Sequence, residues 1–478
     1  MPTDEQALAI NEAVAFLLDR RPLTAMVLRG AAGTGKTTLA AAIVKALLRL
    51  KQKLILLAPT GRAAKVFALY AGCPAYTIHR RIYRQKTAGG LSDFSLNDNL
   101  HRDTLFIVDE ASMIAAYGGV EGTSFGSGSL LADLVHYVYQ GQNCRLLLIG
   151  DHAQLPPVGE EESPALSAAV LQTLGLNVHE AWLSEVLRQS QQSGILWNAT
   201  SIRRMVEDDG ATTLPMIRFN GFEDIVSVSG DELIEALAGS YSRVGVDETI
   251  VVTRSNKRAV IYNNGIRNTV LDREEELCRG DQLMIVKNNY FWSERLKGDD
   301  GTIPLSFLAN GDCCVVQRVR NVHELYGFRF ADVTILLPDY DGLELTVTVL
   351  LDTLSTEAPA LTREQQEQLF QSVMEDYADI PLKQERLKAL RSDAHYNALQ
   401  VKYGYAVTCH KAQGGQWAHV YIDQGYMTED MLCPSARGGL SEGRRGGSDY
   451  LHWLYTALTR ATEKVFLVNW PQQQTATE

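Results

Sequence analysis

Short, uninterrupted apolar runs recur through the first third of the chain, and stretches with helical spacing separate them. The runs cover residues 26–28, 54–57, 105–108 and, directly after Arg145, 146–149. Runs of this length are typical of strands buried on both faces of a parallel sheet. After the first run, apolar residues recur at helical intervals, at Leu39, Ile43, Leu47 and Leu50. This alternation predicts an α/β fold with a parallel sheet.

The pattern changes in the second half of the chain. Between residues 277 and 351 the alternating runs are short and β-rich, which indicates a small barrel. Residues 362–399 are charged and helical in period, and their simplest interpretation is a solvated face. Strand-like runs return at 420–422 and 465–468. We therefore expect two α/β lobes, the second interrupted by the barrel.

These patterns set the expected domain boundaries. The first lobe covers residues 1–180, with a polar hairpin inserted at 81–103. The second lobe is split into residues 181–274 and 401–478. The barrel and the charged helical segment occupy residues 275–400 between its two parts.

The amino-acid composition is typical of a folded protein in a reducing compartment. Of the 478 residues, 45% are hydrophobic, and the seven cysteines include no C-x-x-C pair. We therefore expect reduced thiols and a cytoplasmic chain. No apolar run approaches the length that spans a bilayer, so we expect no membrane partner. The net charge of −12 argues against general affinity for nucleic acid but leaves room for a local basic groove.

The stretch at residues 30–37 fits G-x-x-x-x-G-K-[ST], between a buried strand and a helix. Its glycines let the backbone approach phosphate oxygens, and the helix start offers N–H groups to them. Lys36 would reach the β- and γ-phosphates, and Thr37 would hold Mg2+. The alternative, an unrelated glycine-rich turn, is disfavoured because both flanking elements are those that the motif requires.

Polar residues follow other predicted strands. Asp109-Glu110 fits a pair in which Asp109 binds Mg2+ and Glu110 deprotonates the attacking water. Gln154 would contact the γ-phosphate, or would simply cap its loop. Gln6 would present its amide to adenine, although a solvated glutamine at a helix start is an equally good interpretation.

The order of these segments is recognisable. The strings Gly-Asp-x-x-Gln-Leu-Pro-Pro at 150–157 and Ala-Leu-Thr-Arg-Ala at 457–461 are the most specific. Together with 30–37, 109–112 and 407–414, they resemble superfamily-one helicases of the 5′→3′ branch, the Dda, RecD and Pif-type group. Ala412-Gln413-Gly414 stands where that family often has Ser-Gln-Gly, and residues 354–400 depart further from the family pattern.

The resemblance implies two RecA-like P-loop domains, with a hairpin inserted in the first and an SH3-like barrel in the second. It implies an ATP-dependent DNA helicase that translocates 5′→3′, using ATP and Mg2+ bound between the two domains. The implied partners are single-stranded DNA and duplex junctions, with RNA as a further possibility. A monomer is expected, with repair or replication proteins as possible partners.

The resemblance also implies a residue set for each task. The catalytic set is Lys36, Asp109, Glu110, Gln154, Arg188 and Arg460. The nucleotide set is Gln6, Gly33, Thr34, Gly35, Lys36, Thr37 and Thr38, with Thr37 and Asp109 on Mg2+. Arg188 and Arg460 would stabilise charge on the transferred phosphoryl group, whereas surface ion pairs are the alternative for both.

Nucleic-acid contacts are expected from both lobes. The gripping set is Pro59, Thr60, Arg62, Thr77 and His79 in the first lobe, and Thr408, His410 and Lys411 in the second. Phe94, in the hairpin, is the candidate for splitting the duplex, with Tyr290, Phe291 and Trp292 as alternatives. Most aromatic residues belong to a core, so a structural role in the core is the alternative for each of the four.

Three other functions compete with the helicase. A subunit that binds nucleic acid and uses ATP only as a switch would carry the same motifs. A small-molecule kinase would need only one α/β lobe and no arginine-bearing stretch near residue 460. A nuclease is disfavoured because the sequence shows no additional carboxylate or histidine cluster with metal spacing.

Overall fold

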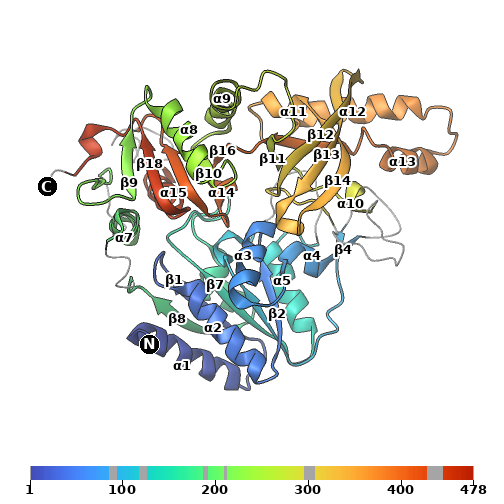
Figure 1. The fold of residues 1–478 in the computed structure, drawn as a ribbon. Coiled ribbons are helices and arrows are strands. Elements are labelled where there is room, and N and C mark those ends of the chain that lie inside the picture. The colour runs from blue at the N-terminus through green and yellow to red at the C-terminus, as the bar shows by residue number, and fades with distance from the viewer. Residues whose placement is uncertain are drawn as a thin grey trace, which may run out of the picture. The chain divides into compact units, whose positions relative to one another are not determined.

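The computed structural model describes residues 2–85, 94–117, 126–186, 192–208, 213–294, 307–427 and 445–476 (Figure 1). The chain divides into two compact units. Unit 1 comprises Met1–Ser227, Gln413–Gln416 and Tyr426–Glu478, and unit 2 comprises Val228–Ala412 and Trp417–Gly425. Within the described ranges, none of the helices has both the length and the apolar character needed to cross a membrane.

A six-stranded parallel sheet forms the centre of unit 1, in the order β3-β2-β6-β7-β1-β8. Its strands are β1 (Thr24–Gly30), β2 (Lys53–Ala58), β3 (Ala75–Thr77), β6 (Thr104–Val108), β7 (Arg145–Gly150) and β8 (Asn177–Leu183). The four apolar runs of the first lobe fall in β1, β2, β6 and β7. The predicted parallel α/β sheet is therefore confirmed.

Helices of unit 1 bury their apolar faces against this sheet. They are α1 (Asp4–Leu18), α2 (Lys36–Arg49), α3 (Gly61–Ala71), α5 (Leu130–Gln140) and α6 (Ala168–Thr173). The helices α7 (Gly194–Glu207) and α15 (Arg445–Leu458) belong to the same unit and pack against each other. Phe16, Val44 and Phe67, from the first three helices, share one buried cluster with Met26 and Ile149 of the sheet. Burying side chains of this size stabilises the fold by about 1.5–3 kcal/mol each.

The strand order brings three loops together. β6, β7 and β1 are neighbours and parallel, so their carboxyl ends lie at one edge of the sheet. The phosphate-binding loop follows β1, Asp109-Glu110 follows β6, and Asp151 follows β7. This is the edge at which open α/β sheets bind ligands.

A small hairpin leaves the first sheet after α4 (Ile78–Ile82). β4 (Tyr83–Gln85) and β5 (Phe94–Leu96) pair antiparallel, from Tyr83↔Leu96 to Gln85↔Phe94. The predicted hairpin insertion is therefore present. Its expected turn at Gly89-Gly90 lies outside the described residues.

A second sheet has the order β16-β10-β17-β18-β9. Its strands are β9 (Ile225–Val228), β10 (Thr249–Thr253), β16 (Ala406–Thr408), β17 (Trp417–Asp423) and β18 (Ala461–Val468). β10 pairs in parallel with both β16 and β17, as a RecA-like sheet requires. The helices of unit 2 near these strands are α8 (Leu233–Arg243), α9 (Asn256–Gly265) and α14 (Cys409–Ala412).

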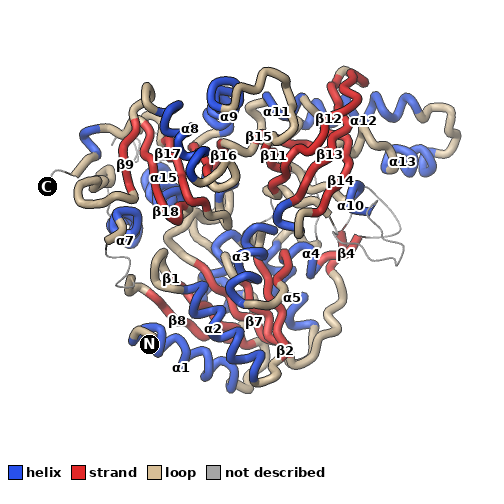
Figure 2. Tube along the Cα trace, in the orientation of Figure 1, coloured by secondary structure: helices blue, strands red, loops and turns tan. Residues whose placement is uncertain are grey.

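The predicted barrel is present in unit 2 as a closed ring of five strands (Figure 2). They are β11 (Gln282–Ile285), β12 (Cys313–Leu325), β13 (Phe328–Leu337), β14 (Leu343–Leu350) and β15 (Leu399–Tyr403). β15 closes the ring by pairing with β11 and with β14. The charged helical segment is therefore an insertion between the fourth and fifth strands of the barrel.

That inserted segment is anchored to the barrel by an apolar face. It contains α12 (Arg363–Asp376) and α13 (Lys383–Arg391), and the shorter helices of this region are α10 (Phe291–Glu294) and α11 (Asp352–Ser355). Leu369, Val373 and Leu390 pack in one buried cluster with Phe330 and Leu350 of the barrel strands. The expected solvated face is only one side of these helices, because the other side is core.

Leu390→Ala is expected to lower the free energy of unfolding of unit 2 by about 2–5 kcal/mol, because it leaves a cavity in this cluster. Leu382→Ala, on a side chain that is 61% exposed, is the matched control and should change it by about 0.5 kcal/mol or less. Urea denaturation of both variants makes the comparison. Equal stability of the two variants would show that the helices are not anchored in this way.

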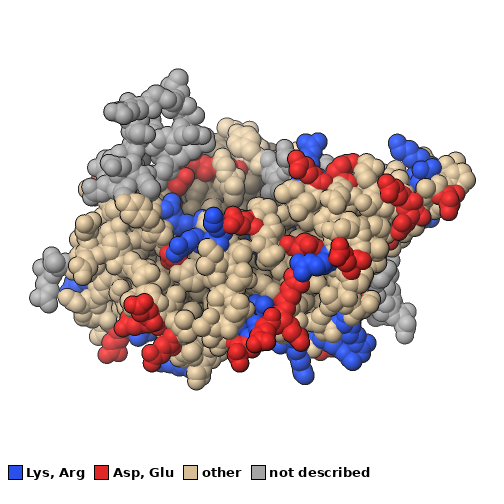
Figure 3. All heavy atoms as spheres, turned by 90° about the horizontal axis from the view of Figure 1, so that it is seen from above, with Lys and Arg blue, Asp and Glu red and all other residues tan. Residues whose placement is uncertain are grey.

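Charged side chains of both signs share the surface drawn in Figure 3. Groups of Lys and Arg lie among Asp and Glu on that face, rather than forming a continuous basic coat. This distribution agrees with the net charge of −12 and with the expectation that any basic groove is local.

Candidate nucleotide site and nucleic-acid interface

The loop between β1 and α2 has the backbone geometry of an anion site. Gly33 and Gly35 have φ of +78° and +79°, a left-handed conformation that favours glycine. Gly35 is also the N-cap of α2, and no side chain caps this end of the helix. The N–H groups of the first turn are therefore left for a ligand, and the helix dipole favours an anionic one.

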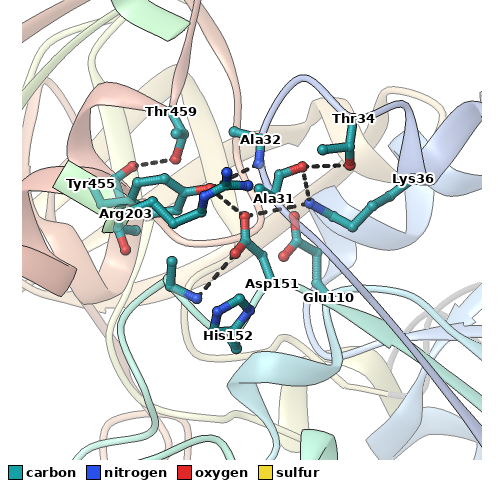
Figure 4. A network of polar contacts seen from close by, with 12 residues as sticks. Ala31, Ala32, Thr34, Lys36, Glu110, Asp151, His152, Arg203, Tyr455 and Thr459 are labelled. Atoms are coloured by element: carbon teal, nitrogen blue, oxygen red, sulfur yellow. Dashed lines mark hydrogen bonds and ion pairs between the residues drawn. The ribbon is translucent and has the colours of Figure 1, made fainter. Parts of the chain in front are cut away.

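Lys36 lies over this loop. A Cβ atom at Gly30 would come within 2.5 Å of Lys36 Cγ, so the glycine makes room for the lysine stem. Lys36 Nζ donates to the carbonyl oxygen of Ala31 at 3.0 Å and lies 3.4 Å from Asp151 Oδ2. The side chain of Asp151 is fully buried (Figure 4). A buried carboxylate therefore balances the lysine charge at the place where phosphates are expected.

Tyr455, from α15, completes this network. Its hydroxyl donates to Asp151 Oδ2 at 2.7 Å and accepts a hydrogen bond from the backbone N–H of Ala32 at 2.8 Å (Figure 4). The sequence analysis assigned no role to either residue, although Asp151 belongs to the string at 150–157 and Tyr455 lies two residues before the string at 457–461. Burial raises the pKa of Tyr455 well above its ordinary value, so the phenol stays protonated.

The carboxylates after β6 occupy the neighbouring strand end. Burial, together with repulsion from Glu110, raises the pKa of Asp109 to about 7. Its Oδ1 accepts the backbone N–H of Glu110 at 2.9 Å. Glu110 has φ of +53°, which costs a residue other than glycine about 1–3 kcal/mol and is typical of functional positions. Figure 4 shows its carboxylate directed toward Lys36, beside that of Asp151.

The oxygen atoms of this edge fit Mg2+ and a triphosphate. The first turn of α2 carries Thr37, and the carboxylate of Asp109 lies at the end of β6; hydroxyl and carboxylate oxygens are ligands that Mg2+ prefers. Gln154 is 4% exposed, and its Oε1 atom has no hydrogen-bond partner among the described residues. A buried acceptor of this kind costs about 1–3 kcal/mol, and an attacking water molecule could donate to it.

Gln6 contacts the loop from the other side. Its Nε2 donates to the carbonyl oxygen of Thr34 at 3.1 Å, and its Oε1 accepts the backbone N–H of Thr3 as part of a capping box. Thr34 is buried, and its hydroxyl donates to the Ala31 carbonyl oxygen at 2.8 Å. Thr38 is exposed in the first turn of α2. Gln6 therefore connects α1 to the phosphate-binding loop by a hydrogen bond.

A hollow of about 500 Å³ borders the same loop. Its lining includes Val186, Leu196, Trp197 and Arg203, from the chain after β8 and from α7. A Cβ atom at Gly33 would lie 3.0 Å from Leu196 and 3.4 Å from Val186, which places the hollow directly beside the phosphate-binding loop. Its volume is in the range of small-molecule sites.

One face of α15 is joined to the loop after β7. His452 Nδ1 donates to the Ala153 carbonyl oxygen at 2.8 Å, and the Leu155 N–H donates to Thr456 Oγ1 at 2.8 Å. With Tyr455, these side chains recur at i, i+3 and i+4 and therefore project from the same side of the helix. Burial lowers the pKa of His452, which keeps the ring neutral.

Arg460 follows this helix and is 3% exposed. Its guanidinium donates to the carbonyl oxygens of Thr456 and Gly415, at 3.1 and 3.3 Å, and to Thr459 Oγ1 at 3.3 Å. All three acceptors are neutral, and none of the ion pairs between described residues includes Arg460. Arg188 is the second arginine that is expected to stabilise charge on the transferred phosphoryl group, as an arginine finger does. It lies outside the described residues.

Several candidates for nucleic-acid contact lie at strand ends of unit 1. Thr60 lies two residues beyond β2, and Thr77 is the last residue of β3. Each hydroxyl caps the next helix by accepting a backbone N–H, from Ala63 and from Arg80. Each hydroxyl also carries a proton that can be donated to a phosphate oxygen. Burial lowers the pKa of His79 to about 4, so it would contact a phosphate as a neutral ring.

The remaining contact candidates differ in exposure. Pro59 and Arg62 lie beside Thr60, and Arg62 Nη2 donates to the Gln416 carbonyl oxygen at 2.5 Å. The side chain of Phe94 lies outside the described part of the structure. Trp292 is only 4% exposed and donates to a backbone carbonyl, so it belongs to the core of unit 2.

In unit 2, Thr408 ends β16 and the next two candidates lie on α14, where His410 is exposed. Lys411 lines a small hollow together with Thr408 and Lys402. Burial and the neighbouring Lys402 lower the pKa of Lys411 to about 8. Burial also lowers the pKa of Lys402 to about 8. Two ammonium groups close together, with depressed pKa values, favour an anion between them.

Comparison with known families gives two matches. A family model described as an AAA domain matches residues 3–222, and one described as a UvrD-like helicase C-terminal domain matches residues 403–434. The first match contains the phosphate-binding loop, both carboxylates after β6 and the loop after β7. The second contains Thr408, His410 and Lys411.

Relatives among characterised and uncharacterised proteins match parts of the sequence. The ATP-dependent RecD2 DNA helicase of Deinococcus radiodurans is 32% identical over 160 residues, which cover 33% of this chain and 18% of that protein. An uncharacterised protein of Methanocaldococcus jannaschii is 34% identical over 173 residues, which cover 32% of this chain and 13% of that protein. The matched segment thus spans less than a fifth of either relative.

Solved structures are also similar to the whole chain. The Pif1 helicase from Bacteroides in complex with ADP-AlF3 and single-stranded DNA is 15% identical, with a TM-score of 0.46, and the match covers 100% of this chain and 95% of that chain. The Pif1 helicase from Candida albicans is 15% identical, with a TM-score of 0.43, and the match covers 100% of this chain and 96% of that chain.

Proposed function

Since the chain resembles superfamily-one helicases of the RecD and Pif type, we propose that it is an ATP-dependent DNA helicase that moves 5′→3′ along single-stranded DNA. The observation that carries this proposal is the meeting of three loops at the β6-β7-β1 edge. It joins an uncapped helix start, a carboxylate pair of which Asp109 is buried, and a buried amide oxygen without a hydrogen-bond partner among the described residues, as nucleotide hydrolysis requires.

The proposed chemistry assigns one task to each group. The N–H groups at the start of α2 and Lys36 bind the phosphates. Thr37 and Asp109 would hold Mg2+, which neutralises charge on the phosphate oxygens when it is bound. Glu110 takes a proton from the attacking water, which Gln154 orients. Arg460 stabilises charge on the transferred phosphoryl group.

The segment Gln413–Gln416 supports coupling between this chemistry and DNA. Gln413 Nε2 donates to the Leu155 carbonyl oxygen at 2.6 Å, and the Gly415 carbonyl oxygen accepts from Arg460. The next residue, Gln416, accepts from Arg62, and a Cβ atom at Gly414 would lie 2.8 Å from Thr60 Oγ1. One short segment therefore touches both groups assigned to ATP and groups assigned to DNA, so a shift driven by ATP would reach the DNA contacts.

We propose that the helicase has the expected domains. These are the first RecA-like domain at 1–180, the two parts of the second at 181–274 and 401–478, and the inserted barrel with its helical segment at 275–400. Single-stranded DNA and duplex junctions are its proposed partners, ATP and Mg2+ its proposed ligands, and a monomer its proposed state. Phe94, in the hairpin, is the proposed wedge. The alternative is a subunit that binds nucleic acid under ATP control and does not unwind it.

Steady-state ATP hydrolysis with and without oligonucleotide, followed by unwinding of 5′-tailed, 3′-tailed and RNA-containing duplexes, tests the proposal. We expect hydrolysis stimulated by single strands and unwinding of the 5′-tailed DNA duplex. Stimulation without any unwinding would favour the switch subunit. Hydrolysis that ignores every oligonucleotide would contradict both functions, and preferential unwinding of the 3′-tailed duplex would contradict the direction.

Binding of single-stranded DNA is expected to weaken as the pH rises from 7 to 9. Lys411 and Lys402 carry their charge below a pKa of about 8 and lose it above. An ordinary lysine keeps its charge throughout this range. The loss is expected to be about tenfold at most for each lysine, since about a tenth of each group remains protonated one unit above its pKa.

Fluorescence anisotropy of a labelled oligonucleotide, without ATP, measures this dependence. Lys411→Gln should flatten the pH profile, whereas Lys383→Gln, at an exposed position of α13, should leave it unchanged. An identical slope in Lys411→Gln and in the unmodified protein would show that this lysine does not contact DNA.

A further inference from the structure

The hydroxyl of Tyr455 occupies a position that a nucleotide needs. It accepts the N–H of Ala32, a backbone donor of the phosphate-binding loop, at 2.8 Å. Through Asp151 Oδ2 the same hydroxyl is linked to Lys36, so one continuous chain of polar contacts spans the loop (Figure 4). In this arrangement both a loop amide and the loop lysine are paired with groups of the protein.

We propose that Tyr455 is a nucleotide-displaced latch, whose hydroxyl holds the place of a phosphate oxygen while the site is empty and leaves when ATP or ADP binds. This inference rests on the proposed function of the site as a nucleotide site. It adds a role for a residue of α15 that contacts the loop directly.

The exchange is favourable because of the charges involved. A hydrogen bond from an amide to an anionic phosphate oxygen is about twice as strong as one to a neutral hydroxyl. Lys36 likewise exchanges a 3.4 Å contact with Asp151 for direct contact with phosphate. Asp151 remains buried, so its carboxylate keeps the backbone N–H of Ala153, which donates to Oδ1 at 3.1 Å. The nucleotide therefore competes only for the Oδ2 side of this carboxylate.

Displacement has a consequence at the end of the helix. Tyr455 stands five residues before Arg460, and Thr456, the acceptor for Arg460 Nε, is its neighbour in the chain. While Tyr455 contacts the loop, Arg460 is held by Thr456, Thr459 and Gly415. A shift of Tyr455 off the loop moves this turn of α15 and frees Arg460, so the finger is released only once the site is filled.

Tyr455→Phe tests the latch because it removes only the competing hydroxyl. Equilibrium titration with a fluorescent ADP analogue, in the absence of DNA, should show about three- to tenfold tighter binding than the unmodified protein. Basal hydrolysis at subsaturating ATP should rise by a similar factor. Tyr421→Phe, which removes a buried hydroxyl bonded to Ser240 at 2.7 Å in unit 2, is the matched control and should leave ADP affinity unchanged.

The unmodified protein provides a second readout that does not depend on how the variant folds. ADP should slow hydrogen exchange at residues 30–37 and speed it in α15, since α15 loses its contact with the loop. Unchanged ADP affinity in a folded Tyr455→Phe variant, or α15 exchange that ADP leaves unchanged or slows, would overturn the latch alone. Failure of the unmodified protein to bind ADP or ATP at all would overturn the proposed function as well.

Discussion

Replacing Glu110 with glutamine is expected to lower DNA-stimulated ATP turnover by about 10²–10⁴-fold, because the amide cannot accept the proton of the attacking water. ATP binding should survive this change. Repulsion from Glu110 is one of the causes that raise the pKa of Asp109, so removing the charge favours the ionised Asp109 that Mg2+ requires. The expected signature is therefore a fall in kcat with little change in the affinity for ATP.

Glu161→Gln is the matched control, since this glutamate is exposed beyond the loop that follows β7. It should hydrolyse ATP at the rate of the unmodified protein. Single-turnover hydrolysis separates the chemical step from product release in both variants. A rate for Glu110→Gln within a few-fold of the unmodified protein would remove Glu110 from its proposed role as base and leave only a positional one.

Much of the first sheet follows from the apolar pattern because its central strands are buried on both faces. β1, β2, β6 and β7 read as uninterrupted apolar runs for this reason. β8 is an edge strand, with the sequence Asn-Val-His-Glu-Ala-Trp-Leu and only two buried residues, so its pattern is hard to distinguish from a loop. The second lobe is expected to begin at residue 181, and the last three residues of β8, at 181–183, lie beyond that boundary.

The barrel was predicted from the sequence only in part, for a different reason. Its first four strands fall where short alternating runs are found, but the fifth, β15, lies beyond three helices, α11, α12 and α13. β15 contains Gln400 and Lys402, both buried, which the sequence marks as polar surface positions. These side chains are satisfied inside unit 2, since the amide oxygen of Gln400 accepts the Leu361 N–H and Lys402 donates to the Thr356 carbonyl oxygen. Such partners are set by tertiary packing and leave no local signal.

The candidate site likewise contains residues that the sequence predicts and residues that only the structure identifies. Lys36, Asp109 and Glu110 could be placed together from sequence because the carboxyl ends of parallel strands meet at one edge. The contact between Tyr455 and Asp151 joins residues 304 positions apart. Nothing in the spacing of the tyrosines distinguishes Tyr455 from its neighbours, so only the structure identifies it as a member of the site.

Replacing Arg460 with alanine is expected to lower ATP turnover by about 10³–10⁵-fold, the effect of removing an arginine finger. The physical reason is the buried charge. Arg460 is 3% exposed and is held by neutral oxygens, so the developing charge of the transferred phosphoryl group would be its natural counter-ion. If it served only as a structural cap for Thr456 and Gly415, its removal would affect stability rather than turnover.

Three variants separate these outcomes. Arg460→Lys keeps the charge but cannot reproduce the planar fork of the guanidinium, so turnover should remain low although the charge is present. Arg243→Ala, at the exposed end of α8, is the matched control and should retain full turnover. Thermal melting and ATP binding, measured on Arg460→Ala itself, identify loss of folding. A folded Arg460→Ala variant that hydrolyses ATP within a few-fold of the unmodified rate would show that Arg460 is not the finger, and the proposed stabilisation of the phosphoryl group would then need another cation.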